Sequence, residues 1–508
     1  MTQKLYLCIH GHFYQPPREN PWTDEIEMQP TAAPFHDWNE RIFQECYKPN
    51  TEAIIADLAT NEILERVNNF EYLNFNFGPT LLHWIKEKHP DTFCKIIDAD
   101  KNSVNSHNGH GNAIAQVYNH IIMPLANQND NITQIKWGLY DFEFHFGRKS
   151  EGIWLAETAC NNDTLEYLIE ENVKFIILDP SQSLKIRKIG NADWEDVSEG
   201  NINTGKPYRA FSKKYTDKYI DIFFYDGPLS RSIAFEDIIF SSERLMERIN
   251  NLIIPNFEKP QLINMAVDGE TFGHHKHFSE RTIAYLMSKL ASKKGFRVVN
   301  YSEYLSLYPP DYEVLLNAGL NNEGKSWSCA HGVGRWKSDC GCSTGGEPNW
   351  NQKWREPLRN ALNHLRDKLS IIFELEGVKY FADVWKARNE YIKIILDASS
   401  ENIKEFFNQN AIRTLNENET KNALKLLEIQ KYSLLMFTSC GWFFSDISGI
   451  ETVQILAYAK RTIEISKELF NVNLEDDLLN ELSKAISNKA EFKNGAEIYK
   501  QINAENRK

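Results

Sequence analysis

One buried-strand pattern, followed at once by acidic residues, constrains this chain more than any other feature. The segment Gln261-Leu-Ile-Asn-Met-Ala-Val267 is mostly apolar and has the length of a buried strand of a parallel sheet. Asp268 and Glu270 come directly after it, and Ser279 to Leu290 then has helical spacing, with Ser279 as the expected N-cap. Barrels of alternating strands and helices present their catalytic groups at the C-terminal ends of strands. The sequence therefore predicts an active site at Asp268 and Glu270.

A second predicted strand, Lys4 to Ile9, leads into two histidines. His10 and His12 are one residue apart, so on a strand both side chains point to the same face. Their place at a strand end beside a glycine favours substrate hydrogen bonding or metal ligation over a purely structural pair. Gln15 follows in the same loop and is a further candidate for substrate contact.

Further strand-like runs recur between residues 70 and 300. Gly152-Ile-Trp-Leu-Ala156 is apolar and ends in Glu157, a second acid directly after a buried strand; the alternative is that Glu157 caps the next helix. We predict other strands over residues 72–78, 175–179, 219–226 and 296–299, and helices over residues 50–68, 80–89 and 113–126. Strands that alternate with helices over this length favour an α/β barrel or a related sheet.

Three more candidate histidines lie between these runs. His107 and His110 belong to a Gly-rich polar junction, and His120 lies in the helix predicted to follow it. All three are candidates for the pocket of His10 and His12, although a histidine on an apolar helix, as His120 is, is more often part of the core.

The pattern changes after residues 308–310. Arg355 to Leu375 carries leucines at helical spacing, and similar patterns continue towards the C-terminus. The predicted fold class is therefore α/β, with a catalytic domain over residues 1–310 and a mainly α-helical region over residues 311–508.

A loop rich in Cys, Gly and Trp, residues 326–354, lies in the second of these regions. One hypothesis is a structural zinc site, because the loop holds three cysteines and a histidine, but their spacing matches no standard zinc finger. The candidate ligands are Cys329, His331, Cys340 and Cys342. The other hypothesis is a loop that packs over the active site and touches substrate. The candidate contacts are Trp327, Arg335, Trp336 and Trp350.

Composition narrows the choice of partner. A net charge of -13 argues against a nucleic-acid or anionic membrane surface, since both need clustered Lys and Arg. The 12 Trp, 21 Tyr and 29 Phe suit a sugar-binding site, although aromatic residues also fill cores. Scattered cysteines, and a start without a signal-peptide pattern, lead us to expect a cytoplasmic protein.

Three of these motifs together resemble the conserved regions of glycoside hydrolase family 57. They are His10-Gly-His12, Gly152-Ile-Trp-Leu-Ala-Glu157 and Val267-Asp-Gly-Glu-Thr-Phe-Gly-His274. The segments 326–354 and 437–451 look like an uncharacterised branch of that family. Its members include α-amylases, 4-α-glucanotransferases, amylopullulanases and glycogen branching enzymes. The resemblance implies an incomplete (β/α)7 barrel, a helical region that helps to close the active site, and no required cofactor.

The resemblance also implies roles for individual residues. Glu157 corresponds to the catalytic nucleophile and Asp268 to the general acid/base of a retaining double displacement on α-linked glucan, such as glycogen, starch or maltooligosaccharide. The expected partner is an oligo- or polysaccharide. The substrate-binding candidates are His10, His12, Gln15, His110, His120, Trp154, Glu270, His274, Trp327, Arg335, Trp336, Trp350 and Asp446.

Two alternatives of other classes stay open. In the first, an α-mannosidase-like or deacetylase-like enzyme, His10 and His12 bind zinc together with an acid such as Asp268. In the second, the chain is a carbohydrate-binding or regulatory protein that kept the barrel without catalytic activity, which the presence of both acids disfavours. The sequence does not separate hydrolysis from glycosyl transfer.

Overall fold

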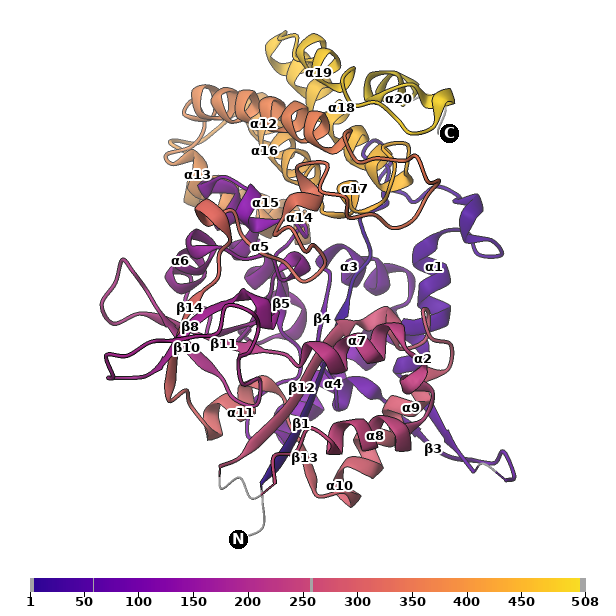
Figure 1. Ribbon diagram of the computed structural model, residues 1–508. Helices are drawn as coiled ribbons and strands as arrows, with labels where there is room; N and C mark the ends of the chain where they lie inside the picture. Colours follow the sequence, from indigo (N-terminus) through magenta and orange to yellow (C-terminus); the bar gives the residue numbers. More distant parts are fainter. Residues whose placement is uncertain (1–3, 58, 256–258, 503–508) are drawn as a thin grey trace. The chain divides into compact units, whose positions relative to one another are not determined.

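The computed structural model describes residues 4–57, 59–255 and 259–502, and it divides into two compact units (Figure 1). Unit 1 comprises Met1–Gln15, Met28–Gln116 and Phe142–Ala318. Unit 2 comprises Pro16–Glu27, Val117–Asp141 and Gly319–Lys508. Two short segments from the first third of the chain therefore belong to the same unit as the C-terminal helices.

Seven strands of unit 1 follow one another in parallel pairs or bridges. They are β1 (Leu5–Phe13), β4 (Asn74–Phe77), β5 (Ala115–Gln116), β6 (Ile153–Trp154), β7 (Phe175–Leu178), β11 (Tyr219–Phe224) and β12 (Gln261–Asp268). Ladders join β12 to β1, β1 to β4, β5 to β6 and β7 to β11, and single bridges lead from β4 towards β5 and from β6 towards β7. Beyond the end of β11, the backbone N–H of Asp226 donates to the Asn264 carbonyl in β12, at 2.9 Å.

The longest of these pairings joins β1 to β12, which run side by side (Figure 1). It extends over eight residue pairs, and both strands are buried along nearly their whole length. Strands buried on both faces are typical of parallel sheets covered by helices. Gly269, just after β12, allows a close approach, because a Cβ there would lie 2.4 Å from the ring of Phe13.

Helices connect and cover these strands. They are α1 (Trp38–Ile42), α2 (Lys48–Asn50), α3 (Pro79–Lys88), α4 (Pro90–Ser106), α6 (Asn162–Glu170), α7 (Gly227–Phe235), α8 (Ser242–Asn250), α9 (Ser279–Tyr285), α10 (Ala291–Lys293) and α11 (Tyr301–Leu307). A short strand, β13 (Phe296–Val298), adds to the other edge of β1. The predicted strands over 72–78, 152–156, 175–179, 219–226, 261–267 and 296–299 are thus confirmed, each with its ends shifted by a few residues.

A smaller part of unit 1 is largely antiparallel and was not predicted. The strands β8 (Ser183–Lys188), β9 (Glu195–Asp196), β10 (Tyr208–Phe211) and β14 (Tyr312–Leu316) extend the sheet of β7 and β11. The mixture of charged and apolar residues in β8 and β14 hides the strand pattern, because one face of this extension is solvated.

Two helix predictions in the first third are wrong. Residues 50–68 form a β-hairpin of β2 (Ala53–Ala56) and β3 (Ile63–Val67), although Leu58 itself lies outside the described residues. Asp57 makes the turn by accepting from the backbone N–H groups of Ala59 and Thr60, a tight local structure that a helix period cannot reveal. Residues 113–126 form β5 and a 3-10 turn, not a helix.

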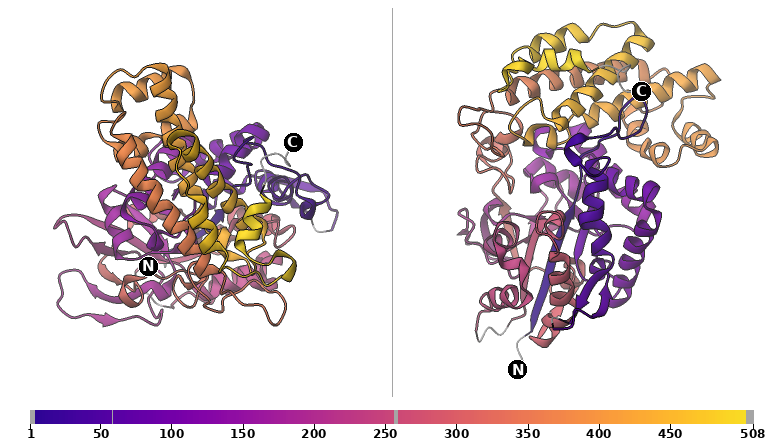
Figure 2. Two further views of the ribbon diagram at one scale, coloured as in Figure 1. Left: turned by 90° about the horizontal axis from the view of Figure 1, so that it is seen from above. Right: turned by 90° about the vertical axis from the view of Figure 1, so that its right-hand side faces the viewer.

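Unit 2 is mainly helical. Its helices are α12 (Arg355–Gly377), α13 (Val384–Glu390), α14 (Ile392–Leu396), α15 (Ser400–Asn410), α16 (Glu417–Leu435), α17 (Cys440–Phe443), α18 (Ile450–Phe470), α19 (Glu475–Leu482) and α20 (Gly495–Gln501). The helix α5 (Gln128–Phe146) begins in unit 2 and ends in unit 1. The long helices α12, α16 and α18 lie side by side (Figure 2). Within the described residues, no helix combines the length and apolar character that crossing a bilayer requires.

A buried ion pair ties three helices of unit 2 together. The Arg388 guanidinium donates to Asp130 of α5 at 2.9 Å and to the Gln430 side chain of α16 at 3.1 Å. Both charged side chains are almost completely buried. Removal of one partner from such a pair leaves the other charge without compensation.

We therefore expect Arg388→Met to lower the free energy of unfolding by about 3–5 kcal/mol, the usual cost of breaking a buried pair. Urea unfolding followed by circular dichroism measures it. Arg413→Met is the matched control, since Arg413 pairs with Glu419 on the surface, and it should leave the unfolding midpoint unchanged. Equal midpoints for the two variants would contradict this role of Arg388.

Candidate active site

The strand register places the predicted site residues of unit 1 at one end of the sheet. His12 of β1 pairs with Asp268 of β12 on one side and with Asn76 of β4 on the other. His10, two residues earlier, pairs with Asn74 of β4. The carboxyl ends of β1, β4 and β12 thus bring these side chains together, as the sequence predicts for residues after parallel strands.

The two histidines belong to a buried hydrogen-bond network. His10 lies 2.8 Å from Asn74 Oδ1 through Nδ1 and 3.1 Å from Asn76 Oδ1 through Nε2. The Asn76 amide nitrogen donates to Nδ1 of His12 at 3.0 Å and to Gln116 Oε1 at 2.9 Å. The network fixes the orientation of both rings.

Trp154 stacks on both imidazole rings. Its ring centroid lies 4.6 Å from that of His10 and 5.0 Å from that of His12, with interplanar angles near 20°. Trp154 is fully buried and comes from β6, three residues before Glu157. This aromatic contact therefore joins the His-bearing strand to the strand that carries the predicted nucleophile.

Burial keeps His10 uncharged. Loss of hydration lowers the pKa of His10 from 6.5 to about 4, although the hydrogen bonds to Asn74 and Asn76 oppose the shift. A neutral imidazole carries one N–H, so His10 donates to only one of the two asparagine oxygens that face its ring nitrogens.

Glu157 has an unusual backbone conformation. It lies in the 3-10 turn η5 (Ala156–Thr158) with φ of 57°, and Thr158 also has a positive φ, of 53°. Consecutive residues other than glycine in the left-handed region cost of order 1–3 kcal/mol each and concentrate at functional sites. Two hydrogen bonds between Thr158 and the buried Gln182 side chain hold the turn.

Glu157 and Asp268 interact electrostatically. Asp268 is reached by solvent, but the protein around it removes much of its hydration, and this together with the negative charge of Glu157 raises its pKa from 3.8 to about 7. Asp268 is therefore partly protonated near neutral pH. An ionised acid beside a protonated acid is the arrangement that separates a nucleophile from an acid catalyst.

Glu270 is buried behind this pair. Its Oε1 accepts from the Tyr47 hydroxyl at 2.6 Å and from the backbone N–H of Tyr14 at 2.9 Å. Burial, with a smaller contribution from the charge of Asp268, raises the pKa of Glu270 to about 8 despite these donors. Gln15 hydrogen-bonds Tyr47 as well. Glu270 and Gln15 thus lie in the same cluster and position the end of β1.

The other predicted histidines of unit 1 contact carboxylates. His274 contacts Glu45 through Nδ1, and His107 lies 2.7 Å from Glu303. His110 lies 2.8 Å from Glu151, which also binds Lys174. All three rings therefore have a carboxylate partner within unit 1.

The remaining candidates belong to unit 2. His120 is buried, with its Nδ1 2.7 Å from the Ser439 hydroxyl, and burial lowers its pKa to about 3. Asp446 accepts from the Ser487 hydroxyl and from the backbone N–H groups of Ser448 and Asn488. These contacts join the loop that contains Asp446 to residues 487–488.

The aromatic residues of the loop 326–354 also pack within unit 2. Trp336 is fully buried, and its carbonyl accepts from Arg359. Arg335 lies over the ring of Phe443, 4.3 Å from its centroid. Trp350 is half-buried beneath Gly346, and Trp327 is half-buried too.

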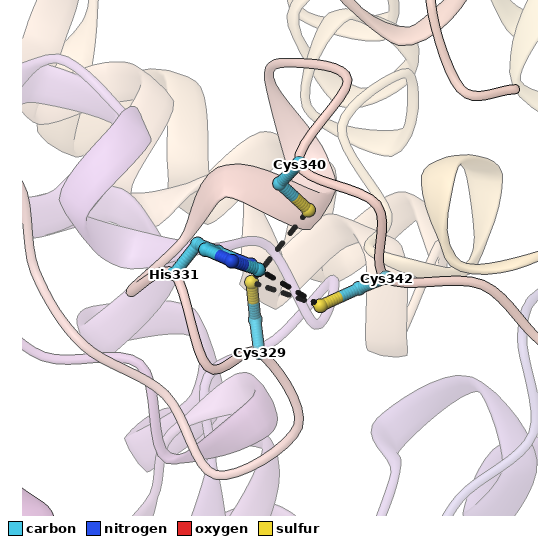
Figure 3. Close-up of side chains that lie close together, drawn as sticks. All are labelled: Cys329, His331, Cys340 and Cys342. Carbon is cyan, nitrogen blue, oxygen red and sulfur yellow. Dashed lines mark hydrogen bonds between the residues drawn. The ribbon is translucent and has the colours of Figure 1, made fainter.

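The four candidate ligands of this loop gather in one place (Figure 3). Each of Cys329, His331, Cys340 and Cys342 offers an atom within 4.8 Å of the others. Burial raises the pKa of Cys329 to about 11, whereas contacts with His331, Cys329 and Cys340 outweigh burial and lower that of Cys342 to about 7.

A separate cavity of about 870 Å³ lies at the opposite end of β12. Gln261, Leu262, Tyr304 and Tyr308 are among its lining residues, and none of its described lining residues is a site candidate from the sequence. Its walls come from the N-terminal end of the strand, away from both acids, so it does not compete as the catalytic site.

Sequence reasoning missed several residues of the site. Asn74 and Asn76 alternate with phenylalanines in β4, and this alternation beside a strand that ends in histidines was the available signal. Tyr47 gave none, because its partner Glu270 is 223 positions away. Tyr225 donates to Asp179 at 2.6 Å and also interacts electrostatically with Asp268.

The geometry gives no support to a metal at the two histidines. Both ring nitrogens of His10 already lie within hydrogen-bonding distance of asparagine side chains. Among residues 4–57, 59–255 and 259–502, the cluster with ligand geometry is that of Cys329, and His10, His12 and Asp268 do not form one.

Comparison with family models gives two matches. Residues 5–317 match the model of glycosyl hydrolase family 57, and residues 350–507 match a domain of unknown function (DUF3536). The first match covers more than half of the chain and includes every site residue of unit 1.

Two curated relatives and one solved structure are similar. A 4-alpha-glucanotransferase of Thermococcus litoralis is 21% identical over 292 residues, 56% of this chain and 39% of that protein. Alpha-amylase 1 of Dictyoglomus thermophilum is 24% identical over 193 residues, 37% of this chain and 22% of that protein. The chain thus spans well under half the length of both. The crystal structure of an exo-type maltose-forming amylase from Pyrococcus sp. ST04 has a TM-score of 0.66 at 15% identity, covering 94% of this chain and 83% of that chain, and shows the fold alone.

The neutral state of His10 has a consequence for stability. Because its pKa is lowered in the folded state, the unfolded chain binds more protons below pH 6.5, and stability falls as pH falls from 6.5 towards 4. Between pH 6.5 and 5, the wild type should lose free energy of unfolding at up to about 1.4 kcal/mol per pH unit because of His10. We therefore expect the loss over this range to be roughly 2 kcal/mol smaller in His10→Asn than in the wild type.

Urea unfolding at several pH values measures this slope, which is the test even if the variant is less stable overall. His83→Asn is the control, because His83 is an exposed histidine of the same unit. Its slope should equal that of the wild type. An unchanged slope in His10→Asn would contradict this prediction, because it would show that His10 has the same pKa in the folded and the unfolded chain.

Proposed function

Because the chain belongs to glycosyl hydrolase family 57, we propose that it is a retaining glycoside hydrolase or transglycosidase that acts on α-linked glucans such as glycogen, starch or maltooligosaccharides. The names of the two curated relatives, a glucanotransferase and an amylase, support this substrate class. The observation that carries the reaction type is the electrostatic coupling of Glu157 and Asp268 at the ends of two parallel strands.

We also propose that the seven parallel strands of unit 1 form an incomplete (β/α)7 barrel. Their consecutive pairings and the hydrogen bond from Asp226 to Asn264 support it, since that bond links the last-but-one strand to β12. The catalytic domain then covers residues 1–310 and the helical region residues 311–508, as the change of sequence pattern suggests.

In the first step, Asp268 donates its proton to the glycosidic oxygen while the Glu157 carboxylate attacks the anomeric carbon. The bond to the leaving sugar breaks, and a covalent glycosyl ester forms on Glu157. The second step reverses the roles. The Asp268 carboxylate takes a proton from water, or from a sugar hydroxyl, as that oxygen displaces Glu157.

The roles follow from the two environments. Asp268 has the raised pKa and can hold a proton near pH 7, whereas Glu157 supplies the negative charge that raises it. Once the glycosyl ester has neutralised Glu157, its charge no longer raises the pKa of Asp268. The pKa of Asp268 then falls, and the ionised carboxylate can act as the base of the second step.

Around this pair, the proposal gives substrate contact to His10, His12 and Trp154. Their place at the ends of β1 and β6, beside Asp268 and Glu157, supports it. Glu270, Gln15 and Tyr47 position the strand ends, because their contacts join three segments of unit 1.

Glu157→Ala should lower turnover of maltooligosaccharides by about 10³-fold or more, as loss of a covalent nucleophile does. Azide should restore part of the activity and yield a glycosyl azide with the configuration opposite to that of the substrate, which mass spectrometry and NMR detect. Glu87→Ala, an exposed acid on α3, is the control and should keep full activity. A fully active Glu157→Ala would refute the assignment, and wild-type product sizes separate hydrolysis from transfer.

The pH profile tests Asp268. Deprotonation removes the acid, so kcat/KM should fall as pH rises through about 7, the raised pKa of Asp268. Asp268→Asn should be nearly inactive on glucans but should turn over an aryl glycoside, whose leaving group needs no proton, without this basic limb. A basic limb that persists in Asp268→Asn would assign the acid to another residue.

A further inference from the structure

The cysteine cluster of unit 2 lies outside everything proposed above. Cys329, His331, Cys340 and Cys342 fall between the two matched ranges, 5–317 and 350–507. Their side chains converge on one point from a loop whose regular structure is limited, among its described residues, to the 3-10 turn η11 (Gly334–Trp336) (Figure 3). A long irregular loop needs an anchor to hold one conformation.

We propose that these four side chains bind one zinc ion as a structural site. In a tetrahedral site with metal–sulfur bonds of about 2.3 Å and metal–nitrogen bonds of about 2.0–2.1 Å, two sulfurs lie about 3.8 Å apart and a sulfur and a nitrogen about 3.5 Å apart. The sulfur of Cys329 lies 3.9 Å from that of Cys340 and 3.8 Å from that of Cys342, and Cys342 Sγ lies 3.6 Å from His331 Nδ1. These three separations match three of the six edges of a zinc tetrahedron, and all four ligand atoms lie within 4.8 Å of one another.

The same separations are wrong for a disulfide. Bonded sulfurs lie about 2.0 Å apart, roughly half the observed distances. All three thiols of the cluster are unbridged. Three sulfurs and a nitrogen that share one centre satisfy one another poorly as hydrogen-bonding groups, since a thiol is a weak donor and a weak acceptor.

Backbone N–H groups already point at the sulfurs. Those of His331 and Arg335 donate to Cys329, and that of Ala330 donates to Cys342. Such donors stabilise thiolates, the form in which cysteine binds zinc. They therefore supply the second layer of contacts that a metal–thiolate site requires.

Two buried arginines place positive charge beside the cysteine cluster. Arg335 and Arg355 are both buried, and neither forms an ion pair with a carboxylate among the described residues. Arg355 donates to the Cys342 carbonyl at 2.8 Å and interacts electrostatically with the three cysteines of the cluster. Zinc with three thiolates and a neutral imidazole keeps one net negative charge, which compensates cations that the protein would otherwise bury alone.

Four protein ligands fill the coordination of zinc and leave no position for water or substrate, so the site is structural. Its effect is to close the loop from Cys329 to Cys342 and so to hold Arg355, the first residue of α12, against the carbonyls of Phe443 and Phe444. The zinc fixes the start of the longest helix of unit 2.

Metal analysis of the purified full chain, prepared without chelator, tests the site. We expect about one zinc per chain. Cys340→Ser and Cys342→Ser should each weaken zinc binding by more than about 10-fold, since changes around the ligands alone cost about 10- to 100-fold. Cys94→Ser, at an exposed cysteine of unit 1, is the matched control and should keep its zinc.

A second measurement covers variants that do not fold. Native wild-type protein is titrated with a mercurial in the presence of a zinc-sensitive dye, and cobalt replaces zinc in a parallel sample. Zinc release in step with thiol titration, and the visible spectrum of a tetrahedral cobalt thiolate, support the proposal. Zinc-loaded wild type that retains no metal, or a disulfide between Cys329 and Cys340 in the native chain, overturns it.

Discussion

The parallel pairing of β1 with β12 is the constraint on which the site of unit 1 depends. Its register sets His12 opposite Asp268, and a slip of either strand by one residue would turn one of these two side chains to the other face of the sheet. The pairing is held along its length by apolar residues that are buried on both faces, so the register is strongly specified. The candidate site at the strand ends is therefore positioned by hydrophobic packing along the whole pairing of β1 with β12.

Burial acts in opposite directions on the groups at that end of the sheet. It removes the charge of His10, and it favours the protonated form of Asp268 and Glu270. Such an environment suits the uncharged substrate that we propose. The nearby tyrosine hydroxyls and asparagine amides satisfy the buried polar atoms without adding charge.

The sequence predicted the strands that carry the candidate site because each is a short apolar run followed directly by an acid. Val267 precedes Asp268, and Ala156 precedes Glu157. It failed where local chemistry overrides the pattern. Asp57 turns the chain inside an apparently helical segment, and Phe278 rather than Ser279 precedes the first turn of α9. The roles of Tyr47 and Asn76 depend on contacts made across dozens to hundreds of positions, and no local pattern encodes those. The cysteine cluster was visible as residue types, but only the folded loop gives their separations.

The left-handed turn at Glu157 and Thr158 carries a consequence for evolution of the protein. Gln182 holds this turn in a conformation that the free chain would rarely adopt, so the native state stores strain beside the acid. Substitutions that relax the turn, for example to glycine, would be expected to make the protein more robust to heat while they misdirect the carboxylate. With Glu157 as the proposed nucleophile, selection for thermostability and selection for turnover oppose each other at this turn.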